Sequence, residues 1–256
     1  MSNIMEVQNL SLHFGGVKAV DDVSLTVERG GVTSIIGPNG AGKTTFFNII
    51  SGVYKPSQGT VLFDGDDITK LPQHKISRLG LSRTFQNIRL FSQLNILDNV
   101  VTSLDARAPY NIFEAVLGLP RRKKFDRLNA EKSMHMLEIV GLADYAKEKP
   151  GSLPYGKQRK LELARALASE PKLLLLDEPA AGLNPVEVDE FIQLLAEIRQ
   201  MFDITILLIE HRLKVVYTLS ELVYVIHFGQ LLAKGSAAEI QSNPEVIKAY
   251  MGEDEE

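Results

Sequence analysis

The residues best suited to chemistry form a glycine-rich stretch near the N-terminus, GPNGAGKTT. It matches the spacing G-x-x-x-x-G-K-[ST] of a phosphate-binding loop. Glycines let a backbone turn tightly and aim its N–H groups at phosphate oxygens, and a helix that starts there adds its positive end. The lysine would meet the β- and γ-phosphates, and the first threonine would offer its hydroxyl to Mg²⁺. The residues that we expect to bind a nucleotide here are Gly37, Pro38, Asn39, Gly40, Ala41, Gly42, Lys43, Thr44 and Thr45.

A second chemical feature is the acidic pair Asp177 and Glu178, which ends the apolar run LLLLDEP. Open α/β sheets bind ligands beyond the C-terminal ends of their strands. We therefore expect Asp177 to hold Mg²⁺, directly or through water, and Glu178 to polarise the water that attacks the γ-phosphate. Acidic pairs of this kind are mostly solvated loop residues, but the phosphate loop in the same chain favours the functional interpretation.

His211 follows the apolar run ITILLIE in the same relation to its strand. Because no second His or Cys stands at metal-binding spacing, we reject a zinc site. A hydrogen bond from His211 to the γ-phosphate is the alternative that we favour.

The elements that must position these residues alternate along the chain. Val32–Gly37, Lys172–Pro179 and Ile204–His211 are short apolar runs typical of buried parallel strands. Helical patterns lie between them, so the alternation predicts an α/β sheet covered on both faces. Asp64-Gly65 indicates a hairpin.

The middle of the chain, from Gln86 to Pro150, shows helical periodicity and no clear strand, which predicts a helical subdomain. It contains the segment Ala106–Leu128. The basic run Arg121–Lys124 within it could face lipid headgroups, although such runs are more often a solvated face.

The composition bounds the class of protein. The 256 residues are 45% hydrophobic with a formal net charge of -4 and no cysteine. This excludes disulfides and gives no basic field that would favour nucleic acid. The N-terminus has no pattern of a signal peptide, and no apolar run reaches the length of about 20 residues needed to span a bilayer. Any membrane role should therefore come through a partner.

The order of motifs, GPNGAGKTT, RTFQN, LPYGKQR, LLLLDEPAAGLNP and IEHR, resembles the ATP-binding subunit of ABC transporters over nearly the whole chain. The resemblance implies an α/β P-loop NTPase fold with a mostly parallel core sheet, an antiparallel β subdomain and an α-helical subdomain. It implies one ATP-binding domain over 1–256, with the core in 1–86 and 151–256 and the helical subdomain in 87–150.

The resemblance also implies roles for single residues, with ATP and Mg²⁺ as cofactors. Phe14 would stack on adenine. Gln86 would contact Mg²⁺ and the attacking water and relay the nucleotide state to membrane subunits. Ala181–Pro185 would cross to an opposite subunit, and His211 would be the switch histidine. Lys43, Gln86, Glu178 and His211 would be catalytic, and Thr44, Gln86 and Asp177 would bind the metal.

The stretches FGGVKAVDDVSL, RTFQNIRLF, LLIEHRLKVV and NPEVIKAYMG resemble one branch, the ATP-binding subunits of high-affinity branched-chain amino acid importers. This implies a second ATPase subunit (a heterodimer, or a homodimer), two permeases, and a solute-binding protein that acts indirectly. The chain would lie peripherally on the cytoplasmic face of the inner membrane, with the helical subdomain from Asn87 against the permeases. Urea, amides and other amino acids stay open as the solute.

The signature of this family, usually L-S-G-G-Q, departs from the pattern. The matching residues are Leu153, Pro154, Tyr155, Gly156 and Lys157, and all of them except Pro154 are expected to bind the nucleotide of the opposite subunit. The serine hydroxyl is lost. Pro154 suits the first turn of a helix and Ser152 could cap it, while Gly156 still allows close approach and Lys157 adds a positive charge. We expect nucleotide binding to persist and the two composite sites of a heterodimer to differ in turnover.

Three other classes compete with this interpretation. ABC ATPases of DNA repair or of ribosomes usually carry long coiled coils or two cassettes, whereas this chain has one phosphate loop and no sustained heptads. A P-loop GTPase would need an N-K-x-D stretch, which is absent. A regulator that binds nucleotide without hydrolysis is disfavoured by Glu178 and His211, but Pro154 and Tyr155 leave room for it.

Overall fold

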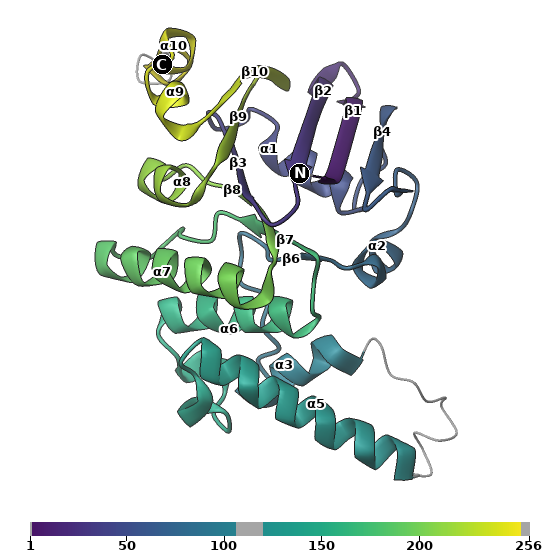
Figure 1. The fold of residues 1–256 in the computed structure, drawn as a ribbon, viewed down its shortest axis with the longest axis vertical. Coiled ribbons are helices and arrows are strands. Elements are labelled where there is room, and N and C mark those ends of the chain that lie inside the picture. The colour runs from purple at the N-terminus through teal and green to yellow at the C-terminus, as the bar shows by residue number, and fades with distance from the viewer. Residues whose placement is uncertain (1, 106–119, 252–256) are drawn as a thin grey trace.

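A six-stranded sheet forms the centre of the computed structural model, which describes residues 2–105 and 120–251 (Figure 1). The strand order is β10-β9-β3-β8-β7-β6, and every neighbouring pair is parallel except β9 and β10. The mostly parallel core sheet is thus confirmed. Its strands are β3 (Val32–Ile36), β6 (Leu81–Arg83), β7 (Leu173–Asp177), β8 (Thr205–Ile209), β9 (Leu222–His227) and β10 (Gln230–Gly235).

The run of leucines in β7 shows why the central strands are continuously apolar. Successive side chains of a strand point to opposite faces, and both faces of this sheet are covered. Leu174 and Leu176 pack with the helices α6 (Tyr155–Ala168) and α7 (Pro185–Phe202). Leu173 and Leu175 pack on the other face, in a cluster that includes α1 (Lys43–Ile50) and the second sheet.

The second sheet is antiparallel, with the order β2-β1-β4-β5. Its strands are β1 (Asn3–Phe14), β2 (Val17–Glu28), β4 (Gln58–Phe63) and β5 (Asp66–Asp67). Asp64 and Gly65 join β4 to β5 with φ of 52° and 87°, as the turn of a tight hairpin requires. The expected hairpin and antiparallel β subdomain are therefore present.

The remaining helices surround this core. They are α2 (Gln73–Leu79), α3 (Ile96–Asp105), α5 (Pro120–Ile139), α8 (Leu213–Leu219), α9 (Ala237–Gln241) and α10 (Pro244–Met251), with short 3₁₀ turns at Ala143–Tyr145 and Pro150–Ser152. α3, α5 and α6 contact one another at one end of the molecule (Figure 1). The described part of 87–150 contains helices and no strand. The exact division into a core and a helical subdomain stays a proposal, because α6 packs both with α3 and α5 and with the core sheet.

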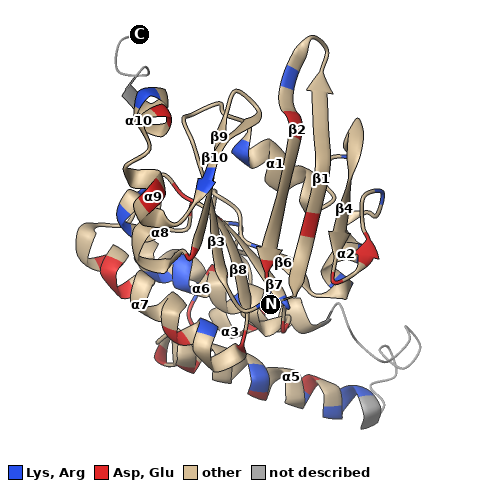
Figure 2. Cartoon of the chain, turned by 45° about the horizontal axis from the view of Figure 1, so that its top comes forward, with Lys and Arg blue, Asp and Glu red and all other residues tan. Residues whose placement is uncertain are grey.

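The start of α5 carries the basic run. Lys123 and Lys124 are exposed, and Arg122 pairs with Asp126 at 3.3 Å, while residues 106–119 and the side chain of Arg121 lie outside the described part. Lys/Arg and Asp/Glu alternate along α5 in Figure 2, as on a solvated helix. Lipid contact by this run stays the less favoured of the two interpretations. No helix among the described residues is both long enough and apolar enough to cross a bilayer.

Candidate functional site

The glycine-rich loop connects β3 to α1, in the strand–loop–helix order that the sequence predicts. Two of its glycines leave no room for a side chain. A Cβ at Gly37 (φ +149°) would lie 1.9 Å from the carbonyl oxygen of Ile226, and one at Gly42 (φ +100°) would lie 2.2 Å from that of Ala19. These positions need glycine both for the left-handed backbone and for the close approach of neighbouring chain. The loop can thereby turn its N–H groups toward one point.

Lys43 is the first residue of α1 and is only 7% exposed. Its ammonium donates to the carbonyl oxygens of Gly37 at 2.6 Å and Pro38 at 2.7 Å, at the other end of the same loop. The compact positive charge of the Lys43 ammonium is thus held inside the curve of the loop, next to the N-terminus of a helix. This is the electrostatic setting that a phosphate group requires.

A cavity of about 450 Å³ opens over the loop and brings distant residues together. Gln86 and Glu178 line it beside the loop residues Asn39 to Thr45. The predicted site residues do not include the other residues that line it, which are Val17, Lys18, Ala19, Phe228 and Gly229. Phe228 is 80% exposed with φ +44°, at the turn between β9 and β10. The His-Phe-Gly turn was the only sequence signal for it, and turns of that kind seldom indicate a site.

Glu178 stands at the C-terminal end of β7 and carries its carboxylate toward the cavity. Its φ of +47° is unusual for a residue other than glycine, and strained backbone of this kind concentrates at functional sites. Oε2 accepts a hydrogen bond from Gln86 Nε2 at 2.8 Å and lies 3.9 Å from His211 Nδ1. The three residues that the sequence proposes for water activation and for sensing the γ-phosphate therefore meet at one carboxylate.

The His211 loop is fixed by a neighbouring acid. Glu210 is fully buried, and its carboxylate accepts hydrogen bonds from the backbone N–H groups of Ala180, His211 and Arg212 at 2.9 to 3.0 Å. Because Ala180 follows Glu178 by two residues, Glu210 joins the end of β8 to the end of β7. The His211 ring itself stays half exposed, free to approach a ligand.

Asp177 is buried and paired, which the sequence did not indicate. Arg83 Nη2 donates to its Oδ2 at 2.8 Å, and Nη1 of the same guanidinium donates to Asn48 Oδ1 and Ser51 Oγ of the α1 end. Arg83 is another residue beside the candidate site that the sequence did not indicate, since an arginine 94 residues before its partner carries no signal of the pairing.

The donor set fits a magnesium ion. Asp177 Oδ1 is buried without a hydrogen-bond partner among the described residues, so one hard oxygen is left for a cation or its water. Thr44 and Gln86 line the cavity, whereas Asp177 is not among its lining residues. The described residues contain no cluster of three or more His, Cys, Asp or Glu that could hold a metal alone. Mg²⁺ usually binds through one or two protein oxygens together with substrate phosphates, so such a cluster is not required.

Phe14 lies at the end of β1, before the Gly15-Gly16 turn. Its ring is 48% exposed and contacts Tyr54 edge to face, with the centroids 5.5 Å apart. It is not among the residues that line the cavity over the phosphate loop. The exposed ring is available to a base, and its stacking on adenine stays a prediction.

The signature residues begin α6, but Ser152 does not cap the helix. Pro154 is the N-cap residue, and no side chain bonds to the first turn. Ser152 instead donates its hydroxyl toward Glu148 Oε2 and the Lys149 carbonyl oxygen, because a 3₁₀ turn at Pro150–Ser152 directs it backward. The expectation that Ser152 caps α6 is therefore wrong. The first N–H groups of α6 are left for another acceptor.

The side chains of the signature contact their own chain. A Cβ at Gly156 would lie 2.6 Å from Glu187 Oε1 of α7, and one at Gly182 would lie 2.7 Å from the Tyr155 ring. Tyr155 thus covers the AGLNP loop. The Lys157 ammonium reaches the Tyr145 hydroxyl and lies 3.9 Å from its ring centroid, so its charge is directed at Tyr145.

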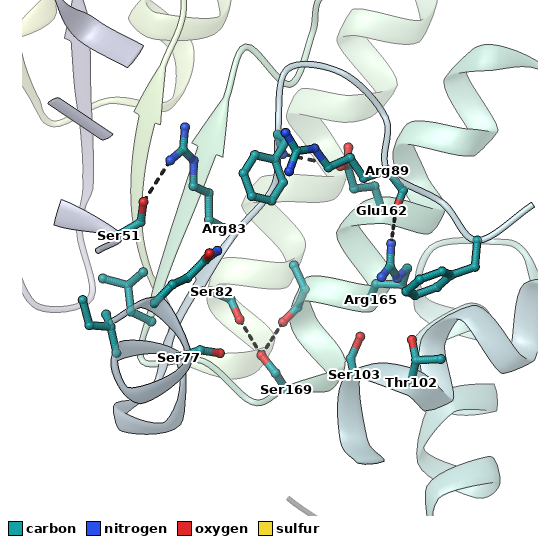
Figure 3. A pocket seen from close by; sticks show the side chains of 16 residues that line it. Ser51, Ser77, Ser82, Arg83, Arg89, Thr102, Ser103, Glu162, Arg165 and Ser169 are labelled. Atoms are coloured by element: carbon teal, nitrogen blue, oxygen red, sulfur yellow. Dashed lines mark hydrogen bonds between the residues drawn. The ribbon is translucent and has the colours of Figure 1, made fainter. Parts of the chain in front are cut away.

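A second cavity, of about 500 Å³, lies between α2, α3, α6 and the segment after β6 (Figure 3). Arg89, Glu162 and Arg165 supply its charges, and Ile76, Phe85 and Phe91 supply apolar surface. Glu162 and Arg165 point from α6 toward the segment that carries Arg89. Burial raises the pKa of Glu162, although the positive charge of Arg159 opposes that shift. This groove touches the same segment as Gln86.

Comparison with family models finds two matching stretches of the chain. Residues 20–181 match the model described as ABC transporter. Residues 230–256 match the model described as branched-chain amino acid ATP-binding cassette transporter. The first match contains the phosphate loop, Gln86, the signature and the acidic pair.

Curated relatives extend the match to nearly the full length. The chain is 45% identical over 250 residues to the high-affinity branched-chain amino acid transport ATP-binding protein BraF of Pseudomonas aeruginosa, covering 98% of each chain. It is 41% identical to LivG of Escherichia coli, a protein with the same description, again over 98% of each. The crystal structure of an ATP-binding cassette of an ABC transporter in its ADP conformation is similar, with a TM-score of 0.85, 32% identity, and 98% of this chain and 100% of that chain covered.

Proposed function

This chain belongs to the ABC transporter family of ATP-binding proteins, and from that membership and the site we propose that it hydrolyses ATP to drive an importer of branched-chain amino acids. The observation that carries the hydrolytic part is the meeting of the phosphate loop, Gln86 and Glu178 at one cavity. The solute class is supported by the similarity to BraF and LivG over 98% of the chain and by the C-terminal match.

In this proposal the loop binds the ATP phosphates through its N–H groups and through Lys43. Glu178 accepts a proton from water in line with the γ-phosphate, and Gln86, bonded to Glu178, orients that water. His211 donates to the γ-phosphate. Thr44, Gln86 and Asp177 would hold Mg²⁺, which when bound neutralises charge on the phosphate oxygens.

The membrane partners are proposed to dock at the groove of Figure 3. It is formed by the helical region and α2, it offers both charged and apolar surface, and it adjoins the segment of Gln86. Two permease subunits would bind there, one to each of two ATPase subunits. The chain would thereby lie on the cytoplasmic face of the inner membrane without crossing it.

The solute is tested by co-expression of this chain with candidate permeases and its second ATPase. We expect uptake of labelled leucine that competes with isoleucine and valine and that is lost in a complex carrying Glu178→Gln. Labelled phenylalanine and urea are the comparison solutes. Uptake of urea alone would contradict the proposed solute class.

The signature offers a second test, on the rate of hydrolysis. We propose that the nucleotide of the opposite subunit meets the N–H groups that begin α6 without the usual serine hydroxyl. One added hydrogen bond of about 0.5–1.5 kcal/mol corresponds to a rate increase of roughly two- to twelvefold if it forms in the transition state. We therefore expect the double variant Pro154→Ser, Tyr155→Gly to raise ATP turnover of the assembled complex by that factor.

The matched control for this test is Ser152→Ala, which removes a hydroxyl two residues earlier that bonds away from α6. It should leave turnover unchanged. An unchanged rate in the double variant would show that the lost serine does not limit turnover, and the proposed difference between the two composite sites would then have no basis in these residues.

A further inference from the structure

The chain segment that carries Gln86 changes its attachment within two residues. Thr84 donates its N–H to the carbonyl oxygen of Leu175 in β7 and so belongs to the core sheet. At Phe85 and Gln86 the backbone carbonyl oxygens instead accept hydrogen bonds from Arg159 of α6, the first at 2.9 Å. The side chain of Gln86 still reaches back to Glu178 of the core. The backbone of Gln86 is therefore hydrogen-bonded to α6, whereas its side-chain amide is hydrogen-bonded to Glu178, the residue after β7.

Arg159 is the first of three α6 side chains that hold this segment. The second is Glu162, whose carboxylate accepts from the backbone N–H groups of Phe85 and Arg89 and pairs with Arg159 at 3.2 Å. The third is Arg165, which donates to the carbonyl oxygen of Arg89. Spaced three residues apart, they occupy successive turns of one helix side and follow the loop from residue 85 to residue 89.

Stability alone does not explain this arrangement. Arg159 is 3% exposed, and a buried ion pair is often no more stable than apolar side chains of the same volume. Arg159 Nε is moreover buried without a hydrogen-bond partner among the described residues. What the three side chains do achieve is geometric, since their hydrogen bonds to residues 85–89 are all to backbone groups and would hold this part of the loop whatever its side chains are.

We propose that Arg159, Glu162 and Arg165 are positioning residues that fasten the backbone of the Gln86 loop to α6 and thereby hold the Gln86 amide against Glu178. The groove of Figure 3 contains Glu162 and Arg165 in its wall, next to the loop itself. The inference rests on the proposed roles of Gln86 and Glu178.

The kinetic test uses Arg159→Met in the assembled importer, because methionine keeps the length and removes the donors. A displacement of about 1 Å at a positioning group can cost 100-fold in rate, so we expect kcat for ATP to fall at least about tenfold. The KM and the affinity for ATP should stay within about twofold of wild type, since the interaction lost serves the transition state alone. Arg159→Lys should recover part of kcat. Arg165→Met, which releases Arg89 instead, should lower kcat in the same way.

Arg127→Met is the matched control, as Arg127 forms an exposed ion pair with Glu131 on α5 at 3.3 Å. It should leave both kinetic constants unchanged. A wild-type kcat in Arg159→Met, or a change confined to KM, would overturn the proposal.

A second measurement does not depend on transport. Because the chain has no cysteine, Asn87→Cys in the full chain can carry a single spin label next to Gln86. We expect an immobilised line shape with Arg159 in place and a mobile one in the Arg159→Met background, with Arg127→Met unchanged. Equal line shapes would overturn the fastening of the loop, whereas failure of the wild-type complex to hydrolyse ATP would instead refute the proposed function.

Discussion

Replacing Glu178 by glutamine is expected to stop ATP hydrolysis while ATP still binds. Glutamine has nearly the same size, so its carbonyl oxygen can still accept the hydrogen bond that Gln86 Nε2 now donates to Oε2 at 2.8 Å. What disappears is the ability to accept a proton from water. A positioned general base contributes about 10²- to 10⁴-fold, so we expect kcat in the assembled complex to fall by at least about 100-fold.

The phosphate loop and Lys43 are untouched in this variant, so the affinity for ATP should stay within about threefold of wild type. ATP that is bound and not consumed should also favour association of the two ATPase subunits, which size-exclusion chromatography with ATP can detect. Glu197→Gln removes an exposed acid on α7 whose carboxylate accepts from Gln193 and should leave kcat unchanged. Turnover at the wild-type rate in Glu178→Gln would remove Glu178 from the role of base.

The sequence predicted those parts of the fold whose signals are local. The central strands β3, β7 and β8 are continuously apolar because both faces are buried. At the start of the helix α7, Asn184 and Glu187 form a capping box, and Pro185 occupies the first turn. Each of these features is visible in a window of a few residues, which is why pattern and composition suffice.

The strands β1 and β2 were expected only through the family resemblance. Their pairing contains several register shifts, and Asn9 and Asp22 adopt positive φ within them. Irregularities of this kind break the alternation by which a half-buried strand is detected in a sequence. The strand β6 gave no signal for a different reason, because its three residues are too few to show an alternation.

The candidate site, like the fold, has parts that the sequence indicates and parts that it does not. Residues within one motif, such as the phosphate loop or Asp177-Glu178, could be proposed from the sequence because their spacing carries the chemistry. Contacts between motifs could not. Arg83 donates to Asp177, which lies 94 residues later in the chain. Arg159 donates to a backbone carbonyl oxygen, a group that every residue carries, so no residue type marks this contact in the sequence. The direction of Lys157 toward Tyr145 also depends on the packing of two helical segments.

Replacing Lys43 by alanine is expected to abolish measurable ATP binding at this phosphate loop. The ammonium is held inside the curve of the loop by the carbonyl oxygens of Gly37 and Pro38, where the β- and γ-phosphates would lie. A hydrogen bond to a charged group contributes about 1.5–3 kcal/mol, and Lys43 would make at least two with the phosphates. The dissociation constant for ATP should therefore rise by about 100-fold or more.

Comparison of this variant with Glu178→Gln separates the binding of ATP from its cleavage. Glu178→Gln should bind ATP and fail to cleave it, whereas Lys43→Ala should fail at binding, so only the second should lose the calorimetric signal of ATP. Lys132→Ala is the matched control, because it removes the same charge from an exposed pair with Glu170 on the helical side. Thermal unfolding without nucleotide reports whether the loss of the two loop contacts weakens the fold itself. Should Lys43→Ala bind ATP with wild-type affinity and an unchanged melting temperature, the glycine-rich loop would not be the nucleotide site, because its one buried cation would then make no contribution to holding a phosphate.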